Sequence, residues 1–236
     1  MYSIDVDEAG HNTHICTCYV WVIYCSDQIL QGASRLTRLR RIMLNLTALR
    51  TYAQTAPESL PSSILFKHSS RNITVFDAYP KSIFHFLLLP RIQEPDLDAS
   101  VLANLGSLLS GDKVKAKKVI TSLWEDAQAV KKEILDEMVG RYGFKWDVWI
   151  GFHSAPSMQY VSILKAISWR HRDERTARHL HLHVLSADLL SDKMKNKKHY
   201  NSFHPKLGFF LHLEDILEWF DAAPTFFSNT VSQPIY

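Results

Sequence analysis

Residues 179–186 read HLHLHVLS and place His179, His181 and His183 at every second position. The residues between the histidines are apolar, and this strict alternation predicts a half-buried β-strand. Successive side chains of a strand point to opposite faces, so the three imidazoles share one face, roughly 6.5–7 Å apart along it. A metal site, a row of hydrogen-bonded core histidines and a reaction centre are all compatible with this pattern.

Strands and helices can be assigned on both sides of this segment. Short polar or proline-containing breaks separate three β-rich runs, which suggests adjacent antiparallel strands; the runs are SILFKHSS, NITVFDAYP and SIFHFLLLP. Residues 97–110 and 113–139 show helical spacing, with Gly140 and Gly143 as stop signals. FKWDVWIGFH alternates as a further strand, and LHLEDILEWF predicts a late helix. Strands on both sides of a helical block indicate an α+β domain, with an antiparallel sheet of about five strands packed with helices.

The bulk composition excludes few functions. With 46% hydrophobic and 22% charged residues the chain has the make-up of an ordinary globular protein. Its net charge of +3 is too small to indicate nucleic-acid binding by itself. Two local basic clusters stand out, KVKAKK at residues 113–118 and KMKNKK at residues 193–198, and such clusters are most often solvated surface.

Neither a targeting signal nor a membrane signal is expected in the first residues of the chain. The three cysteines, Cys16, Cys18 and Cys25, form no C-x-x-C pair, so a reduced, intracellular protein is expected. The apolar run ICTCYVWVIYC is too short to cross a bilayer, and acidic rather than basic residues precede it. No association with a membrane is therefore expected.

Metal chemistry and phosphate chemistry make different demands on the residues around the histidines. Alternating imidazoles could hold zinc, but the lysine-rich segment that follows them is unfavourable beside a divalent cation. A neutral imidazole is a good nucleophile near pH 7, and attack on phosphorus needs positive groups around the developing charge. Lys198 and Lys81 could supply that charge, and Asp77 could accept a hydrogen bond from a ribose hydroxyl. Phosphate chemistry therefore explains more of the surrounding sequence.

The alternating histidines also carry a family resemblance. HLHLHVL matches the H-φ-H-φ-H-φ-φ signature (φ, apolar) of the histidine triad (HIT) superfamily of nucleotide hydrolases and transferases. Four segments resemble the aprataxin family in the same order, namely FDAYPKSIFHFLLLPR, GFHSAPSM, HLHLHVLSAD and KNKKHYNSF. The resemblance covers roughly residues 48–220 apart from one insertion. It implies a HIT-like fold and the removal of AMP from the 5′ ends of DNA after abortive ligation, in single-strand break repair in the nucleus.

The resemblance also implies a role for each residue of the candidate site. His181, the middle histidine, resembles the nucleophile that takes AMP as a covalent adenylyl-histidine. His179 and His183 would orient the nucleophile and bind phosphate oxygens. His153 of GFH matches the residue that assists departure of the DNA 5′-phosphate. Site residues are therefore expected on the triad strand and on the strand that contains GFH.

Four further residues match the family's nucleotide-binding positions. Asp77 resembles the ribose binder, Ser157 of PSM matches a phosphate-contacting hydroxyl, and the last two are the phosphate-contacting lysines Lys81 and Lys198. No metal and no cofactor is required for this chemistry. The implied partners are 5′-adenylated DNA ends and AMP, and the sequence does not identify any repair-protein partner.

Two departures from the family pattern affect the second half of the chain. In the family PSM leads almost directly to the triad strand; here residues 160–178 intervene, and removing these nineteen residues restores PSMQHLHLHV. This segment is interpreted as a retained intron in the gene model, the alternative being a genuine basic loop that touches DNA. No cysteine follows Cys25, so the cysteine-based zinc module of aprataxins is expected to be missing. The expected organisation is an N-terminal extension over residues 1–46, a catalytic domain over residues 47–205, and a C-terminal helix and tail over residues 206–236.

Two other functions stay open at this point. The first is a general HIT hydrolase that acts on small adenylylated molecules, although enzymes of that kind generally lack a segment like KNKKHYNSF. The second is a DNA-end or nucleotide-binding protein whose catalysis is impaired by the insertion and the missing zinc module. Release of AMP from a 5′-adenylated nick separates the enzyme from the binding protein.

Overall fold

The computed structural model describes residues 47–92, 97–153, 179–204 and 207–222. All of them belong to the unit Met43–Tyr236. The predictions for residues 1–46, for Ser157 and for the insertion lie outside the described residues. Among the helices of the described part, none combines the length and the apolar character that crossing a bilayer requires.

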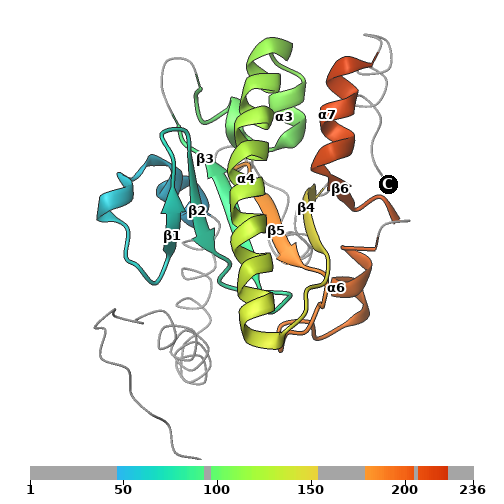
Figure 1. Cartoon of the computed structure of the whole chain (residues 1–236). Coiled ribbons are helices and arrows are strands. Elements are labelled where there is room, and N and C mark those ends of the chain that lie inside the picture. The colour runs from blue at the N-terminus through green and yellow to red at the C-terminus, as the bar shows by residue number, and fades with distance from the viewer. Residues whose placement is uncertain (1–46, 93–96, 154–178, 205–206, 223–236) are drawn as a thin grey trace, which may run out of the picture. The chain divides into compact units, whose positions relative to one another are not determined.

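Six strands form one antiparallel sheet in the order β1-β2-β3-β5-β4-β6 (Figure 1). Their bounds are β1 Leu65–His68, β2 Asn72–Phe76, β3 His85–Pro90, β4 Val148–His153, β5 Leu182–Ser186 and β6 Phe210–His212. The predicted α+β class and antiparallel sheet are confirmed. The five strands expected from the sequence are β1 to β5, and β6 is an additional strand that follows none of the alternation signals. The triad strand β5 lies between β3 and β4, in the middle of the sheet.

Helices occupy the connections and both faces of the sheet. Residues 47–54 are helical, and the other helical elements are η1 Pro57–Ser59, η2 Val101–Ala103, α3 Leu105–Leu109, α4 Lys113–Tyr142, α6 Lys197–Asn201 and α7 Leu213–Asp221. The long helix α4 starts where the Asp112 carboxylate accepts hydrogen bonds from two backbone N–H groups, and it ends at Gly143 with a φ of 75°. The predicted helix over residues 113–139 is present and continues through Gly140 to Tyr142. The late helix is present from Leu213, after β6, and residues 97–110 hold two short helical elements, η2 and α3, in place of one helix.

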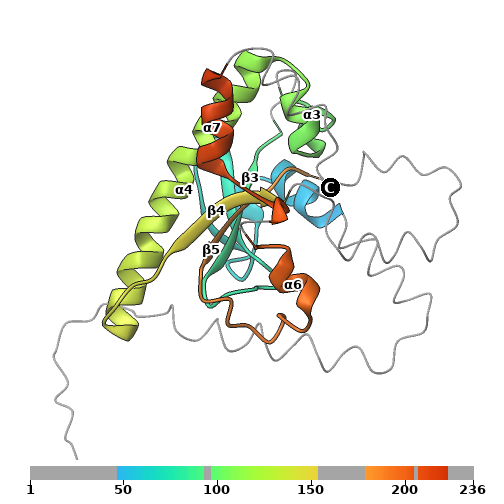
Figure 2. The ribbon, with the colours of Figure 1, turned by 90° about the vertical axis from the view of Figure 1, so that its right-hand side faces the viewer.

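Alternation along the central strands decides which side chains reach the candidate site. Leu182 and Val184 of β5 pack into the core that contains α4. His183 lies between them in sequence and therefore points to the opposite face. Figure 2 shows the sheet with α4 on one side and α6 on the other. The triad histidines thus occupy the face that α4 leaves uncovered.

A close approach of two strands positions the wall of that face. Gly151 of β4 pairs with His183 on one side and with His212 on the other. A Cβ at this position would overlap the Leu211 carbonyl oxygen and the Phe210 ring. Glycine is therefore required here, because it lets β6 bring Phe210 over the triad face.

Candidate active site

Three neighbouring strands bring four imidazoles together. His183 lies on β5, His85 on β3 and His153 on β4, and His181 directly precedes β5. Measured from the His183 ring, the ring centroids of His85, His153 and His181 are 5.2, 4.7 and 5.0 Å away. The structure therefore confirms that the triad strand and GFH meet, and it adds His85, which was not among the predicted site residues.

The hydrogen bonding of His181 leaves one ring nitrogen available. Its Nδ1 lies 2.9 Å from the backbone oxygen of His179, and a carbonyl can only accept, so Nδ1 carries the proton. The lone pair of the neutral ring is then on Nε2. Burial lowers the pKa of His181, against the opposing effects of the His179 carbonyl and Asp77. At neutral pH the ring is thus an uncharged imidazole with an unprotonated Nε2, which is what a nucleophile requires.

His183 has the opposite tautomer to His181, with its proton on Nε2. The hydrogen bond from His85 determines this tautomer. The Lys81 backbone N–H donates to Nδ1 of His85 over 3.0 Å, so His85 carries its proton on Nε2. Nε2 of His85 lies 2.9 Å from Nδ1 of His183 and donates to it. The proton of neutral His183 is then on Nε2, a buried atom without a hydrogen-bond partner in the described part of the chain. His183 therefore offers an N–H donor to an oxygen of a ligand.

His179 has a different task from the other two triad members. Its Nε2 lies 2.7 Å from the Pro90 backbone oxygen at the end of β3 and donates to it. Burial lowers the pKa of His179 to about 4, so the ring is neutral at physiological pH. His179 thus fastens the start of the triad strand to β3 and supplies the carbonyl that orients His181. The His179 ring is thus directed to the backbone, and its role in orienting the nucleophile and binding phosphate oxygens stays a prediction.

His153 stands beside the His183 ring in an apolar wall. The centroids of Phe203 and Phe210 lie 4.8 and 5.5 Å from the His153 ring. Burial is the main reason why the pKa of His153 is lowered to about 4, and the charge of protonated His181 acts in the same direction. His153 is therefore a neutral imidazole at the edge of the candidate site, close enough to act together with His183.

Asp77 and Lys81 lie on the loop between β2 and β3. The Asp77 carboxylate accepts the Tyr79 backbone N–H over 2.7 Å, and its second oxygen lies 3.4 Å from Nε2 of His85. The Lys81 ammonium donates to the Tyr79 carbonyl and lies 6.0 Å from the centre of the Tyr79 ring. Burial lowers the pKa of Lys81, and Asp77 partly offsets this effect. Both residues thus adjoin the imidazoles; the assignment of Asp77 to ribose stays a prediction.

The segment around α6 adds positive charge near Lys81. Lys198 is exposed on α6, which Asn196 caps by accepting the Lys198 backbone N–H over 3.1 Å. The charge of Lys81 contributes to lowering the pKa of His199, and Lys193 contributes to lowering that of Lys81. The KMKNKK segment therefore lies beside the loop that carries Lys81, and the phosphate-binding role of Lys198 stays a prediction.

One cluster has the composition of a metal site. Asp77, His85 and His183 offer ligand atoms that all lie within 4.8 Å of one another, and no fourth His, Cys, Asp or Glu of the described residues joins them. A metal on His85 Nε2 would need the proton on Nδ1, which would then face the Lys81 N–H instead of accepting from it. The polarity of the hydrogen bonds thus suits a chain of neutral imidazoles better than a metal centre.

Treatment with a chelator should therefore leave the protein unchanged. Because His85 already donates its Nε2–H to Nδ1 of His183, with the Asp77 carboxylate beside it, we expect the same Tm before and after dialysis against EDTA. Calorimetry and metal analysis of the purified protein measure this directly. Stoichiometric zinc, with a lower Tm after its removal, would restore the metal interpretation.

The buried imidazoles also predict how stability depends on pH. The pKa of His85, His153 and His179 is lowered by burial to about 4, whereas each titrates near 6.5 in the unfolded chain. Between these values the unfolded chain binds more protons, so stability is complete above about pH 7 and decreases as the pH falls towards about 4. We expect Tm to decrease steadily over that interval. His153→Leu should reduce the slope and His68→Leu, at the exposed end of β1, should not; a constant Tm would contradict the burial of neutral rings.

Comparisons with known proteins agree with the motifs. No family model matches the chain. A HIT domain-containing protein of Dictyostelium discoideum is 27% identical over 179 residues, which cover 74% of this chain and 36% of that protein. An aprataxin-like protein of Saccharomyces cerevisiae is 27% identical over 189 residues, which cover 72% of this chain and 73% of that protein. The chain thus spans about a third of the first relative and about three quarters of the second.

A solved structure supports the fold assignment. It is described as Hnt3 in complex with DNA and guanosine, and it matches with a TM-score of 0.51 and 22% identity, over 78% of this chain and 81% of that one. At this identity the likeness concerns the fold. The HIT-like fold expected from the triad signature is confirmed.

Proposed function

Because the chain is an aprataxin-like protein of the histidine triad superfamily, we propose that it hydrolyses the anhydride that joins AMP to the 5′-phosphate of DNA. The proposal extends to a covalent adenylyl-histidine intermediate and to action on abortively ligated ends in single-strand break repair, in the nucleus. The observation that carries it is the pair of complementary tautomers, a bare Nε2 on His181 beside a free Nε2–H on His183. A nucleophile and a donor for a phosphate oxygen are thus presented together.

In the first step, Nε2 of His181 attacks the phosphorus of AMP. A nitrogen–phosphorus bond forms, the bond from that phosphorus to the bridging oxygen breaks, and the electron pair leaves with the DNA 5′-phosphate. Positive charge develops on the His181 ring, and the His179 carbonyl stabilises it through Nδ1–H. His183 donates Nε2–H to a phosphate oxygen, which is most valuable when negative charge increases in the transition state.

Departure and hydrolysis use the groups around this pair. We assign His153 to departure of the DNA 5′-phosphate, for which its single N–H must turn from the Phe209 backbone to the leaving phosphate. Lys81 and the basic α6 segment offset the charge of that phosphate. A water molecule then attacks the phosphorus, the nitrogen–phosphorus bond breaks, and AMP is released with one proton lost to solvent. His181 returns to its neutral form, and none of these groups has to change its tautomer permanently.

The test compares three molecules, each incubated with the full chain. These are a nicked duplex with a 5′-adenylated end, a small adenylylated amine, and the same nicked duplex with a plain 5′-phosphate. Release of AMP from the first at a much greater kcat/KM than from the second supports the proposal. Preference for the small amine would favour a general nucleotide hydrolase, and binding of DNA without AMP release would favour an end-binding protein. Binding should weaken steeply with salt, because lysine and arginine contacts to phosphate dominate it.

A further inference from the structure

The residues directly after the triad strand form a hydrogen-bonded cluster that the chemistry above does not use. Asp188 follows Ser186, the last residue of β5. One oxygen of its carboxylate accepts the Ser186 hydroxyl and, over 3.2 Å, the Trp146 indole N–H. The other accepts the backbone N–H groups of Ile83 and Leu190 over 3.0 and 2.8 Å. A half-buried carboxylate thus collects four donors from three separate segments.

Two of these contacts reach the segment that leads to His85. The Ile83 N–H is held by Asp188 itself, and the Phe84 N–H donates to the Ser186 hydroxyl oxygen over 3.1 Å. At the other end of the same turn, the Ser191 hydroxyl donates to the Pro80 carbonyl over 2.5 Å. The backbone is therefore fixed on both sides of Lys81.

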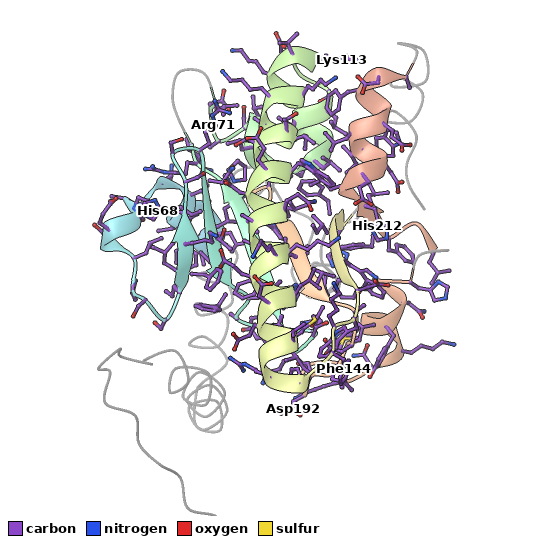
Figure 3. The ribbon with its side chains drawn as sticks, viewed as in Figure 1. His68, Arg71, Lys113, Phe144, Asp192 and His212 are labelled. Atoms are coloured by element: carbon purple, nitrogen blue, oxygen red, sulfur yellow. The ribbon has the colours of Figure 1, made fainter. Side chains whose placement is uncertain are left out.

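The local backbone is shaped to make these contacts. Leu189 has a φ of 49°, in the left-handed region that is unfavourable for a leucine. This conformation lets the N–H of the next residue, Leu190, turn back to the Asp188 carboxylate. Strain of this kind persists where surrounding contacts hold it, and it is often found at functional sites. Figure 3 labels Phe144, which follows the C-terminal end of α4 and precedes Trp146 by two residues.

We propose that Asp188 is a positioning residue for the reaction: it fixes the turn in which the Lys81 N–H meets Nδ1 of His85. That contact keeps the His85 proton on Nε2, and His85 in turn keeps the His183 proton on its own Nε2. Asp188 would thus act on the phosphate-binding donor through two hydrogen bonds without touching substrate. The predicted change in kcat rests on the proposed function. The predicted effect of Asp188 on the tautomers of His85 and His183 does not.

The test is Asp188→Asn in the full chain, with Asp126→Asn as the matched control. Asparagine keeps the shape but replaces one acceptor oxygen by an NH2 group, so two of the four donors lose their partner. Asp126 is a comparable acceptor, taking hydrogen bonds from Ser69 and Asn72 over 2.7 and 2.6 Å. It joins α4 to the start of β2, away from the imidazoles, so its loss should lower Tm without altering them.

Nitrogen NMR of the imidazoles in the free protein is the primary measurement. In the wild type and in Asp126→Asn, His85 and His183 should each show protonated Nε2 and unprotonated Nδ1. In Asp188→Asn both rings should show a mixture of tautomers, and kcat for AMP release should fall about 100-fold with little change in KM. Wild-type tautomers in Asp188→Asn, with only the Tm loss of the control, would overturn the proposal.

A second variant covers the case in which Asp188→Asn does not fold. Ser191→Ala removes the bond to Pro80 and leaves the carboxylate in place, so it should loosen the same turn more mildly and still produce mixed tautomers at His85. Unchanged tautomers in that variant would also overturn the proposal. If the wild type releases no AMP, the proposed function fails while the NMR result still decides the positioning role.

Discussion

His181→Ala should abolish AMP release, with a decrease in kcat on the order of 10⁵-fold or more, the scale expected when a covalent nucleophile is removed. In the proposed mechanism Nε2 of His181 is the atom that forms the bond to phosphorus, and alanine has no atom to replace it. Binding of the adenylated duplex should largely survive, because the lysines proposed to contact phosphate are unchanged. Single-turnover kinetics and a binding titration with the same nicked duplex measure the two effects separately.

His68→Ala is the matched control for this variant. His68 is an exposed histidine at the end of β1, so its removal should leave both the rate and the affinity unchanged. Comparable turnover by His181→Ala and by the control would show that the nucleophile has been misassigned.

His85→Phe should have the second largest effect, a loss of about 10²–10³-fold in kcat, the scale of one lost hydrogen-bond donor to the transition state. Phenylalanine fills the same space but cannot donate to Nδ1 of His183 or accept from the Lys81 N–H. His183 is then free to place its proton on Nδ1, and the donor to phosphate is lost. The rate constant for single turnover and the Tm should be measured together, because a loss of stability alone leaves the rate of the folded fraction unchanged.

His85→Gln provides the rescue. Its amide oxygen can accept the Lys81 N–H and its NH2 group can donate to His183, so activity should lie between that of His85→Phe and that of the wild type. Equal activity of the phenylalanine variant and the wild type would contradict the hydrogen-bond chain from Lys81 to His183.

The fold could be predicted because its signals are local. Alternation identified β1 to β5, and a strand's parity alone placed the histidines opposite the leucines that pack with the α4 core. β6 was not predicted because it has only three residues, Phe210–His212, and runs directly into the helix α7. Its formation depends on Gly151 of another strand, which leaves room for β6 to approach.

Only some of the residues that meet at the site could be predicted, because no single segment of sequence determines the order of the strands in the sheet. In SIFHFLLLP, His85 lies on the same face of the strand as Leu87 and Leu89. A polar residue within such an apolar run is a signal that its side chain has a function. Only the pairing of β3 with β5 shows that His85 meets His183. Only the resemblance singles out His181 as the nucleophile, because strand alternation puts all three triad histidines on one face, and that role stays a prediction. Ser157, predicted to contact phosphate, lies outside the described residues and stays a prediction.

The roles of His179 and Asp77 illustrate the same limit. Alternation along the strand places His179 on the same face as His181 and His183. In the structure its ring is directed to the Pro90 carbonyl, a partner 89 positions away in sequence. The family resemblance assigns Asp77 to ribose binding. In the structure one of its carboxylate oxygens lies near Nε2 of His85, and the other accepts the Tyr79 N–H. A side chain's partners depend on tertiary contacts that no local pattern contains.

Rapid quenching in an alkaline denaturant, which preserves a phosphorus–nitrogen bond, followed by mass spectrometry of the intact protein tests the covalent mechanism most directly. The full chain is mixed with a 5′-adenylated nicked duplex, and samples are quenched at a series of times shorter than one turnover. The protein is then digested to locate the modification. The mechanism predicts a protein species heavier by one AMP group, which forms before free AMP appears and maps to His181. Release of AMP at the full rate, with the protein unmodified at every time, would contradict it.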